Sequence, residues 1–143
     1  MNGVATNDYS RSVSIFLRSI EIWFVISIVE VLHGVARIAL LEPLVGDFRA
    51  RQIAVFTGSV LILAVTYLFR RWIDATSVNE CLEVGTVWGV LTIGFEVVLG
   101  RLILQASWQR ILSDYDLLHG GLMPLGLLVM LFAPLVISKW ARR

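Results

Sequence analysis

The stretch IEIWFVISIVEVLHGVARIALL, residues Ile20 to Leu41, is long and apolar, yet it carries Glu30, His33 and Arg37. A bilayer core of roughly 30 Å needs about 20 mostly apolar residues in one helix, and this stretch meets that condition. Three further stretches meet it as well, at residues 53–69, 84–104 and 117–138. The sequence therefore predicts an all-α integral membrane protein, a four-helix bundle in a single transmembrane domain over residues 1–143.

The composition of the chain also points to lipid as its solvent. Of its 143 residues 57% are hydrophobic and 16% are charged, whereas soluble domains are about 45–50% apolar and about 25% charged. The net charge of +1 gives no electrostatic reason to expect nucleic acid as a partner. Cys81 is the only cysteine, which excludes an intramolecular disulfide and a zinc site built mainly from thiolates.

The distribution of basic residues predicts the orientation. The N-terminal segment, the middle loop and the C-terminal tail are richer in arginine and lysine than the two other loops. Basic residues favour the cytoplasmic side, so we expect both termini in the cytoplasm. The first apolar run begins late and is interrupted by charge, so we expect it to remain in the mature protein. The expected location is the bacterial inner membrane.

Several local signals predict where the helices begin and end. Pro43 and Gly46 are expected to break the chain after the first span, and Ser77 with Glu80 forms a capping box before the third. Asp116 stands where a cap of the fourth helix is expected. Two flanks, residues 9–19 and 105–118, are interpreted as an amphipathic helix on the inner surface and as an outward extension of the third helix.

The first and third spans share a short pattern. The sequence EVLHG, which begins at Glu30, has a counterpart in EVVLG, which begins at Glu96, and an arginine follows each. Further along, GDF at residues 46–48 resembles SDY at residues 113–115. This pattern indicates either an internal duplication into parallel repeats, residues 10–72 and 77–143, or chance similarity between helices rich in valine and leucine.

The charged residues of the spans form the candidate site. At 100° per residue Glu30, His33 and Arg37 lie on one face of the first helix. On the third helix a stripe of small residues with one carboxylate is expected to face another helix: Gly85, Gly89, Thr92, Glu96 and Gly100. Glu30 and Glu96 should then lie at similar depth.

Charges at the centre of a bilayer cost at least about 2.5–3.5 kcal/mol each, so they must be paired, protonated or in contact with water. Two cross-helix ion pairs are expected, Glu30 with Arg101 and Glu96 with Arg37. Alternatively the two carboxylates lie together and share a proton. The cluster then either fixes the packing of the helices or binds a ligand or ion.

The outer loops supply a second set of polar residues. Asp47, Arg49, Asp114 and His119 are predicted to line an outer mouth, although each is also typical of a solvated loop. His33 and His119 are the only two histidines, and two imidazoles from different helices are what a haem requires. The alternative is that both histidines are simply hydrogen-bonded to neighbouring residues.

These features predict a small transporter or a ligand- or ion-binding membrane protein, with membrane lipids as partners and a homo-oligomer or larger membrane complex as its assembly. One alternative is a non-catalytic accessory subunit that docks through the small-residue face around Gly85 and Gly89. The other is a protein that interacts with a quinone, a haem or a lipid. No motif for catalysis on soluble substrates or for phosphate binding is found. The sequence therefore does not decide whether the protein is an enzyme, and it favours a protein that is not one.

Overall fold

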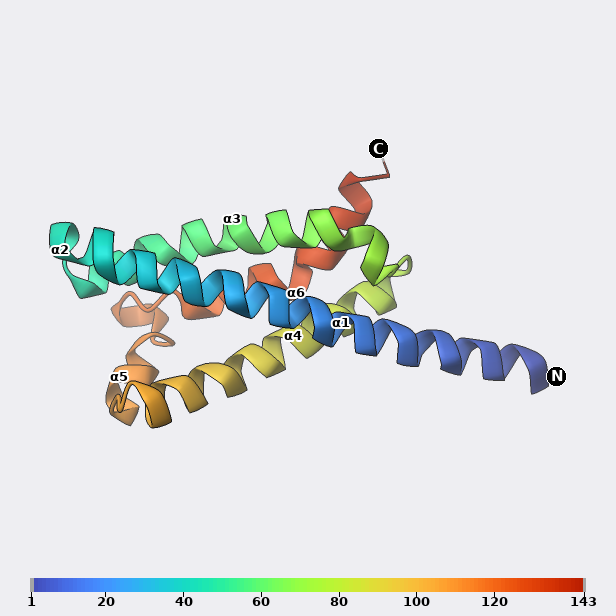
Figure 1. Cartoon of the computed structure of the whole chain (residues 1–143), viewed down its shortest axis with the longest axis horizontal. Helices are drawn as coiled ribbons and strands as arrows, with labels where there is room; N and C mark the ends of the chain where they lie inside the picture. Colours follow the sequence, from blue (N-terminus) through green and yellow to red (C-terminus); the bar gives the residue numbers. More distant parts are fainter. Residues whose placement is uncertain (1, 143) are drawn as a thin grey trace.

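The computed structural model describes residues 2–142, with side chains from residue 7 onward, and all regular secondary structure in this part of the chain is helical. Four of the helical segments are long and apolar enough to cross a membrane, in agreement with the four predicted spans. Both termini lie at the end of the bundle that holds the connection between the second and third spans (Figure 1).

Helix α1, Asn2–Ala36, is much longer than predicted. It continues through a π-helical turn, Arg37–Leu41, into the short helix α2, Glu42–Val45. The candidate span Asn7–Val45 has 39 residues and is therefore about 58 Å long at 1.5 Å per residue. That is almost twice the bilayer core, so the first turns of α1 project beyond the other helices (Figure 1).

The separate surface helix predicted at residues 9–19 is therefore wrong, because this segment is the continuous beginning of α1. The face of this segment that points toward the bundle contacts the loop after the second span. Arg11 Nε lies 2.8 Å from Glu80 Oε1, and Arg11 Nη1 lies 3.7 Å from Asp74 Oδ2. Ile15, one turn further along, is buried. These contacts stabilise a straight helix and not one that bends onto the membrane surface.

Gly46 reverses the chain after α2. Its φ of 83° lies in a region that favours glycine, and α3 begins at the next residue and runs over Asp47–Ile73. The predicted break after the first span thus occurs at Gly46, whereas Pro43 lies inside α2. Helix α3 ends where Asp74 adopts a left-handed conformation with φ 56°.

The predicted capping box before the third span is confirmed. The Ser77 hydroxyl accepts a hydrogen bond from the Glu80 amide, and the Glu80 carboxylate accepts one from the Ser77 amide. Helix α4, Val78–Val98, follows and runs into a second π-helical turn, Leu99–Ile103. Both pairs of spans thus contain a π-helical turn at the end of their first long helix, and the internal duplication stays a prediction.

The predicted extension of the third helix through residues 105–118 is wrong. Gln105 takes a positive φ of 50°, and the Ala106 amide turns back to donate to the Gly100 carbonyl over 2.8 Å. A separate short helix, α5, then forms over Trp108–Ser113. Ser107 caps it by accepting a hydrogen bond from the Arg110 amide, which supplies a local reason for the new helix start.

The fourth span begins later than predicted. Helix α6 covers Met123–Trp140 with Pro124 in its first turn, and it continues beyond Pro134. Asp116 does not cap α6. It caps a short 3₁₀ helix, Leu117–His119, by accepting a hydrogen bond from the His119 amide. The two glycines after this turn separate it from α6.

The buried core lies where α6 packs against α3 and α4, and where α1 packs against the same two helices. Trp88 of α4 is fully buried and donates from Nε1 to the Ser19 carbonyl of α1 over 2.8 Å. Ile22 and Ile26 of α1 and Ile62 of α3 pack into the same cluster. This apolar layer lies between the end of the bundle that holds both termini and the polar residues near the opposite end. After the orientation expected from the sequence, we call these the inner end and the outer end.

Candidate functional site

Glu30 lies on α1 against a glycine of α3. A Cβ atom at Gly58 would stand only 2.9 Å from Glu30 Oε2, so the missing side chain makes room for the carboxylate. His33 bridges the two helices, with Nδ1 3.3 Å from Glu30 Oε2 and Nε2 2.8 Å from Thr57 Oγ1. The sequence offers no signal for these contacts, because no pattern within α3 indicates that Thr57 and Gly58 meet a carboxylate.

The second carboxylate oxygen of Glu30 is one of three buried side-chain polar atoms that lack a hydrogen-bond partner among the described residues. The other two, Arg37 Nη1 and Arg51 Nε, belong to arginines that lie beside Asp47. Oε1 is buried and has no hydrogen-bond partner among the described residues. Buried polar atoms in proteins are almost always paired, because an unpaired one forfeits its hydration without compensation. An oxygen in this position needs a proton of its own, or a donor or cation that the rest of the described chain does not supply.

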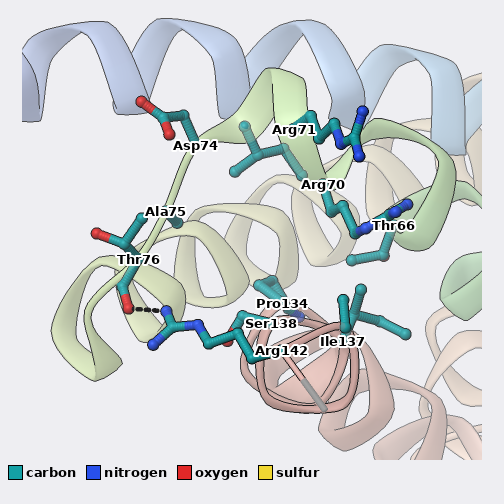
Figure 2. Close-up of a pocket in the computed structure, with 12 residues that line it drawn as sticks. Thr66, Arg70, Arg71, Asp74, Ala75, Thr76, Pro134, Ile137, Ser138 and Arg142 are labelled. Carbon is teal, nitrogen blue, oxygen red and sulfur yellow. Dashed lines mark hydrogen bonds between the residues drawn. The ribbon is translucent and has the colours of Figure 1, made fainter.

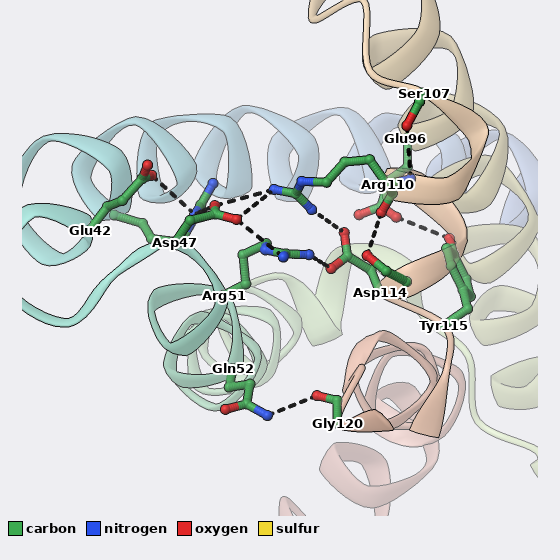
Figure 3. Close-up of polar contacts among 12 residues, drawn as sticks. Glu42, Asp47, Arg51, Gln52, Glu96, Ser107, Arg110, Asp114, Tyr115 and Gly120 are labelled. Carbon is green, nitrogen blue, oxygen red and sulfur yellow. Dashed lines mark hydrogen bonds and ion pairs between the residues drawn. The ribbon is translucent and has the colours of Figure 1, made fainter. Parts of the chain in front are cut away.

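Glu96 of α4 has a partner that the sequence analysis missed. Its Oε2 accepts a hydrogen bond from the Tyr115 hydroxyl over 3.0 Å, from the loop that follows α5 (Figure 3). Burial, followed by the neighbouring charge of Glu96, raises the pKa of Tyr115 above its ordinary value, so this hydroxyl stays a donor. Glu96 also lies near enough to Glu30 for their charges to interact. The only sequence signal for Tyr115 is the SDY motif.

The two predicted ion pairs of these glutamates do not form. Arg37 stands at the start of the π-helical turn and extends toward the following loop, with Nη1 3.7 Å from Glu42 Oε2 and 3.5 Å from Asp47 Oδ1. Arg101 lies in the second π-helical turn and is exposed. It stacks over the Trp108 ring at 5.0 Å and donates to the Ala106 carbonyl. The chain reverses after this turn, so Arg101 contacts the residues that follow it and does not pair with Glu30.

An ionic network covers the outer end of the bundle. Two arginines each bridge Asp47 of α3 and Asp114 of the loop after α5 (Figure 3). Arg51 lies 3.1 Å from Asp47 and also pairs with Asp114, while Arg110 lies 3.2 Å from Asp47 and 3.3 Å from Asp114. We call these four residues, together with Arg37 and Glu42, the outer network.

Two residues predicted at the outer mouth do not join the network. Arg49 is exposed and makes no ion pair with any residue whose side chain is described. The His119 side chain is 82% exposed and pairs with Asp116 of its own turn, Nδ1 to Oδ2 over 2.6 Å. The hydrogen bond from His119 lowers the pKa of Asp116. Since His33 uses both ring nitrogens elsewhere, each histidine is engaged with neighbours of its own.

The polar region ends at a tryptophan on its inner side. Trp23 Nε1 donates to Thr92 Oγ1 over 3.0 Å, and Thr92 in turn donates to Met130 Sδ over 3.2 Å. This contact joins α1, α4 and α6 just above the apolar core. Tyr115, which directly follows Asp114 of the outer network, thus contacts Glu96, while Glu30 contacts His33. No hydrogen bond joins Glu96 to Glu30 among the described residues.

The predicted small-residue stripe of α4 is divided between two environments. At Gly85 a Cβ atom would fall 1.9 Å from the Leu131 carbonyl oxygen, so this glycine is covered by α6. At Gly89 nothing lies within 4 Å of the same position. The face predicted to dock on a partner is therefore partly used inside the chain itself, because α6 needs the close approach that Gly85 permits.

Comparisons of the chain with known proteins give no assignment. No family model, no curated protein and no solved structure matches it. Within residues 7–142 no group of three or more histidine, cysteine, aspartate or glutamate side chains could hold a metal ion. Function is therefore inferred from the geometry of Glu30, Glu96 and their neighbours.

Proposed function

We propose that this protein is a small multi-pass membrane protein of the bacterial inner membrane, with both termini in the cytoplasm, that binds and transports a proton or small cation. The binding centre comprises Glu30, His33 and Glu96. The observation that carries the proposal is the buried Oε1 oxygen of Glu30, which has no partner among the described residues. A proton or a cation supplies what this oxygen lacks.

The charges around the centre support this proposal. The arginines of the outer network already face Glu42, Asp47 and Asp114, so they do not neutralise the two intramembrane glutamates. His33 is the only basic residue within ion-pair distance of Glu30 among the described side chains. Two carboxylates near one another in a low-dielectric region cannot both stay charged without a counter-ion. A bound proton or cation restores the balance.

The contacts also favour exchange with the outer side. Tyr115, which donates to Glu96, directly follows Asp114 of the outer network, whereas Trp23 lies about two turns of α1 before Glu30 and belongs to the buried core. Transport needs a second state in which the inner side opens. The two π-helical turns are natural positions for that change, since such turns are weak points of a helix and are frequent at functional sites. A homo-oligomer or a larger membrane complex, surrounded by lipid, would provide the remaining walls of a pathway.

The test is the proton occupancy of the centre in the reconstituted full chain. We would compare the wild type with Glu30→Gln and Glu96→Gln by infrared difference spectroscopy, which detects the carbonyl band of a protonated carboxyl group. Glu83→Gln is the matched control, because Glu83 lies exposed on α4 and makes no ion pair with a described side chain. We expect the pH-dependent or cation-dependent band to disappear in Glu30→Gln, to shift in Glu96→Gln and to persist in Glu83→Gln.

A band that is unchanged in Glu30→Gln would overturn the proposal. Proton or cation flux into liposomes then distinguishes transport from binding alone. Wild-type vesicles should dissipate an imposed gradient faster than vesicles with Glu30→Gln, and Glu83→Gln should match the wild type. Equal flux rates in all three preparations would indicate that the protein binds the proton or cation without transporting it.

A further inference from the structure

The opposite end of the bundle contains a cavity of about 210 Å³. It lies between the last turn of α3, the α3–α4 loop and the last turns of α6 (Figure 2). Its polar wall contains three arginines, and its apolar wall is formed by buried residues of α3 and α6, including Ile73, Pro134 and Ile137. This cavity shares no residue with the Glu30 centre.

The charge of this cavity is strongly unbalanced. Arg70, Arg71 and Arg142 line it, and among the described side chains none of them makes an ion pair. Asp74 is the only acidic residue among the described residues of the lining, and it already faces two arginines of α1, with Nη1 atoms at 3.7 and 4.0 Å. The cavity therefore presents excess positive charge to whatever enters it.

Two of these arginines are held in place by contacts that leave further N–H groups free. Arg70 stacks over the Tyr67 ring at 4.0 Å and donates from Nη1 to the Tyr67 carbonyl over 2.6 Å. Arg142 donates to the Thr76 carbonyl across the cavity (Figure 2). A guanidinium group has five N–H donors, so each retains donors for an anion. Fixed arginine donors match the geometry of a phosphate group.

The surroundings place the cavity at a membrane boundary. Trp72 and Trp140 are exposed on the neighbouring turns, and tryptophan is enriched at the interface between lipid and water. By the orientation expected from the basic residues, this is the cytoplasmic interface, where anionic phospholipids attract basic residues and bind basic pockets between helices. The apolar wall at Pro134 and Ile137 leads from the arginines toward the hydrocarbon layer.

We propose that this cavity binds the phosphate group of an anionic phospholipid, with Arg70 and Arg142 as its principal donors. Arg71, which is exposed, contributes further positive charge. The acyl chains would leave along the apolar wall into the bilayer. A soluble phosphate compound offers the same chemistry, so the experiment separates these two sources. The inference does not depend on the function proposed for Glu30.

The experiment uses the purified full chain in a zwitterionic detergent and measures lipid binding by native mass spectrometry. The probes are phosphatidylglycerol, phosphatidylcholine and inorganic phosphate. We expect phosphatidylglycerol to bind the wild type, and Arg70→Gln and Arg142→Gln each to weaken it about ten-fold, the effect of one charge-assisted hydrogen bond. Lys139→Gln is the matched control, because Lys139 lies at the same level and does not line the cavity.

Arg142→Gln is expected to leave the protein folded, because Arg142 lies beyond the end of α6 and is exposed. Weaker lipid binding by this variant is therefore not a result of unfolding. Inorganic phosphate that competes with phosphatidylglycerol in the wild type and not in Arg142→Gln would support the same site with a soluble phosphate as its source. Equal weakening by Lys139→Gln and Arg142→Gln would show diffuse surface attraction and overturn the proposal. Equal binding of phosphatidylcholine and phosphatidylglycerol would overturn it as well.

Discussion

The contact between α4 and α6 makes Gly85 the most informative position for testing the fold. A Cβ atom there would lie 1.9 Å from the Leu131 carbonyl oxygen and 2.7 Å from the Leu131 carbonyl carbon. Both neighbours are backbone atoms, so no side-chain rotation relieves the contact. Gly85→Ala therefore requires α4 and α6 to separate by about 1 Å before the contact reaches 3.0 Å, the lower limit of real Cβ contacts.

Two effects of opposite sign determine the size of the change. Replacing glycine by alanine within a helix stabilises it by about 0.8–1 kcal/mol. Overpacking a tight contact costs typically about 1–3 kcal/mol, and here the separation also loosens the buried cluster that contains Val84 and Trp88 of α4 and Met130 and Ala133 of α6. We expect steric cost to dominate in Gly85→Ala, with a net loss in the free energy of unfolding of about 1–2 kcal/mol.

Gly89→Ala, one turn further along the same helix, is the matched control. No atom lies within 4 Å of its Cβ position, so only the gain in helix propensity applies and stability should rise by up to about 1 kcal/mol. The measurement is unfolding of the full chain in mixed micelles with increasing sodium dodecyl sulfate, followed by tryptophan fluorescence. Opposite signs for the two variants are expected. If Gly85→Ala were as stable as Gly89→Ala, the packing of α6 against α4 described above would be refuted.

Two further predictions concern single hydrogen bonds. Because Tyr115 has a raised pKa, its ionisation should be missing from the wild-type absorbance titration near pH 10, where an ordinary tyrosine titrates, and Tyr115→Phe should leave that part of the curve unchanged. Since unfolding releases this proton above about pH 10, wild-type stability should fall there as pH rises, and fall less in Tyr115→Phe. Ser77→Ala removes half of the capping box and should cost about 1 kcal/mol of unfolding free energy in the micelle assay, whereas Ser14→Ala should change it little.

The features that follow from local sequence were predictable. Hydropathy alone located four spans, because each must contain its own apolar residues to cross a bilayer. The capping box at Ser77 and Glu80 was predictable for a similar reason, since its hydrogen bonds join residues only three positions apart. The reversal at Gly46 likewise depends on one residue that tolerates positive φ.

The features that depend on irregular helix geometry were not predictable. Arg37 was placed by counting 100° per residue, and Arg101 was paired with Glu30 on the assumption of regular helices. Each of these arginines instead lies in a π-helical turn, where that spacing no longer holds. The partners of Glu96 and Asp47 were missed because Tyr115 and Arg110 come from a loop and a short helix that the sequence analysis had assigned to a straight extension of the third span. One wrong helix boundary therefore changed the expected partner of several charges.

The charges of the outer half divide into two groups with different physical roles. The outer network contains three arginines and three carboxylates that face one another, so its members are already neutralised within the chain. Such a network holds the beginning of α3 against α5, and exchange of a proton or ion there would break existing pairs. Among the described side chains Glu30 has only His33 as a basic partner, and its buried Oε1 has no hydrogen-bond partner there. Under the function proposed above, uptake of a proton or cation would therefore occur at Glu30 rather than within the outer network.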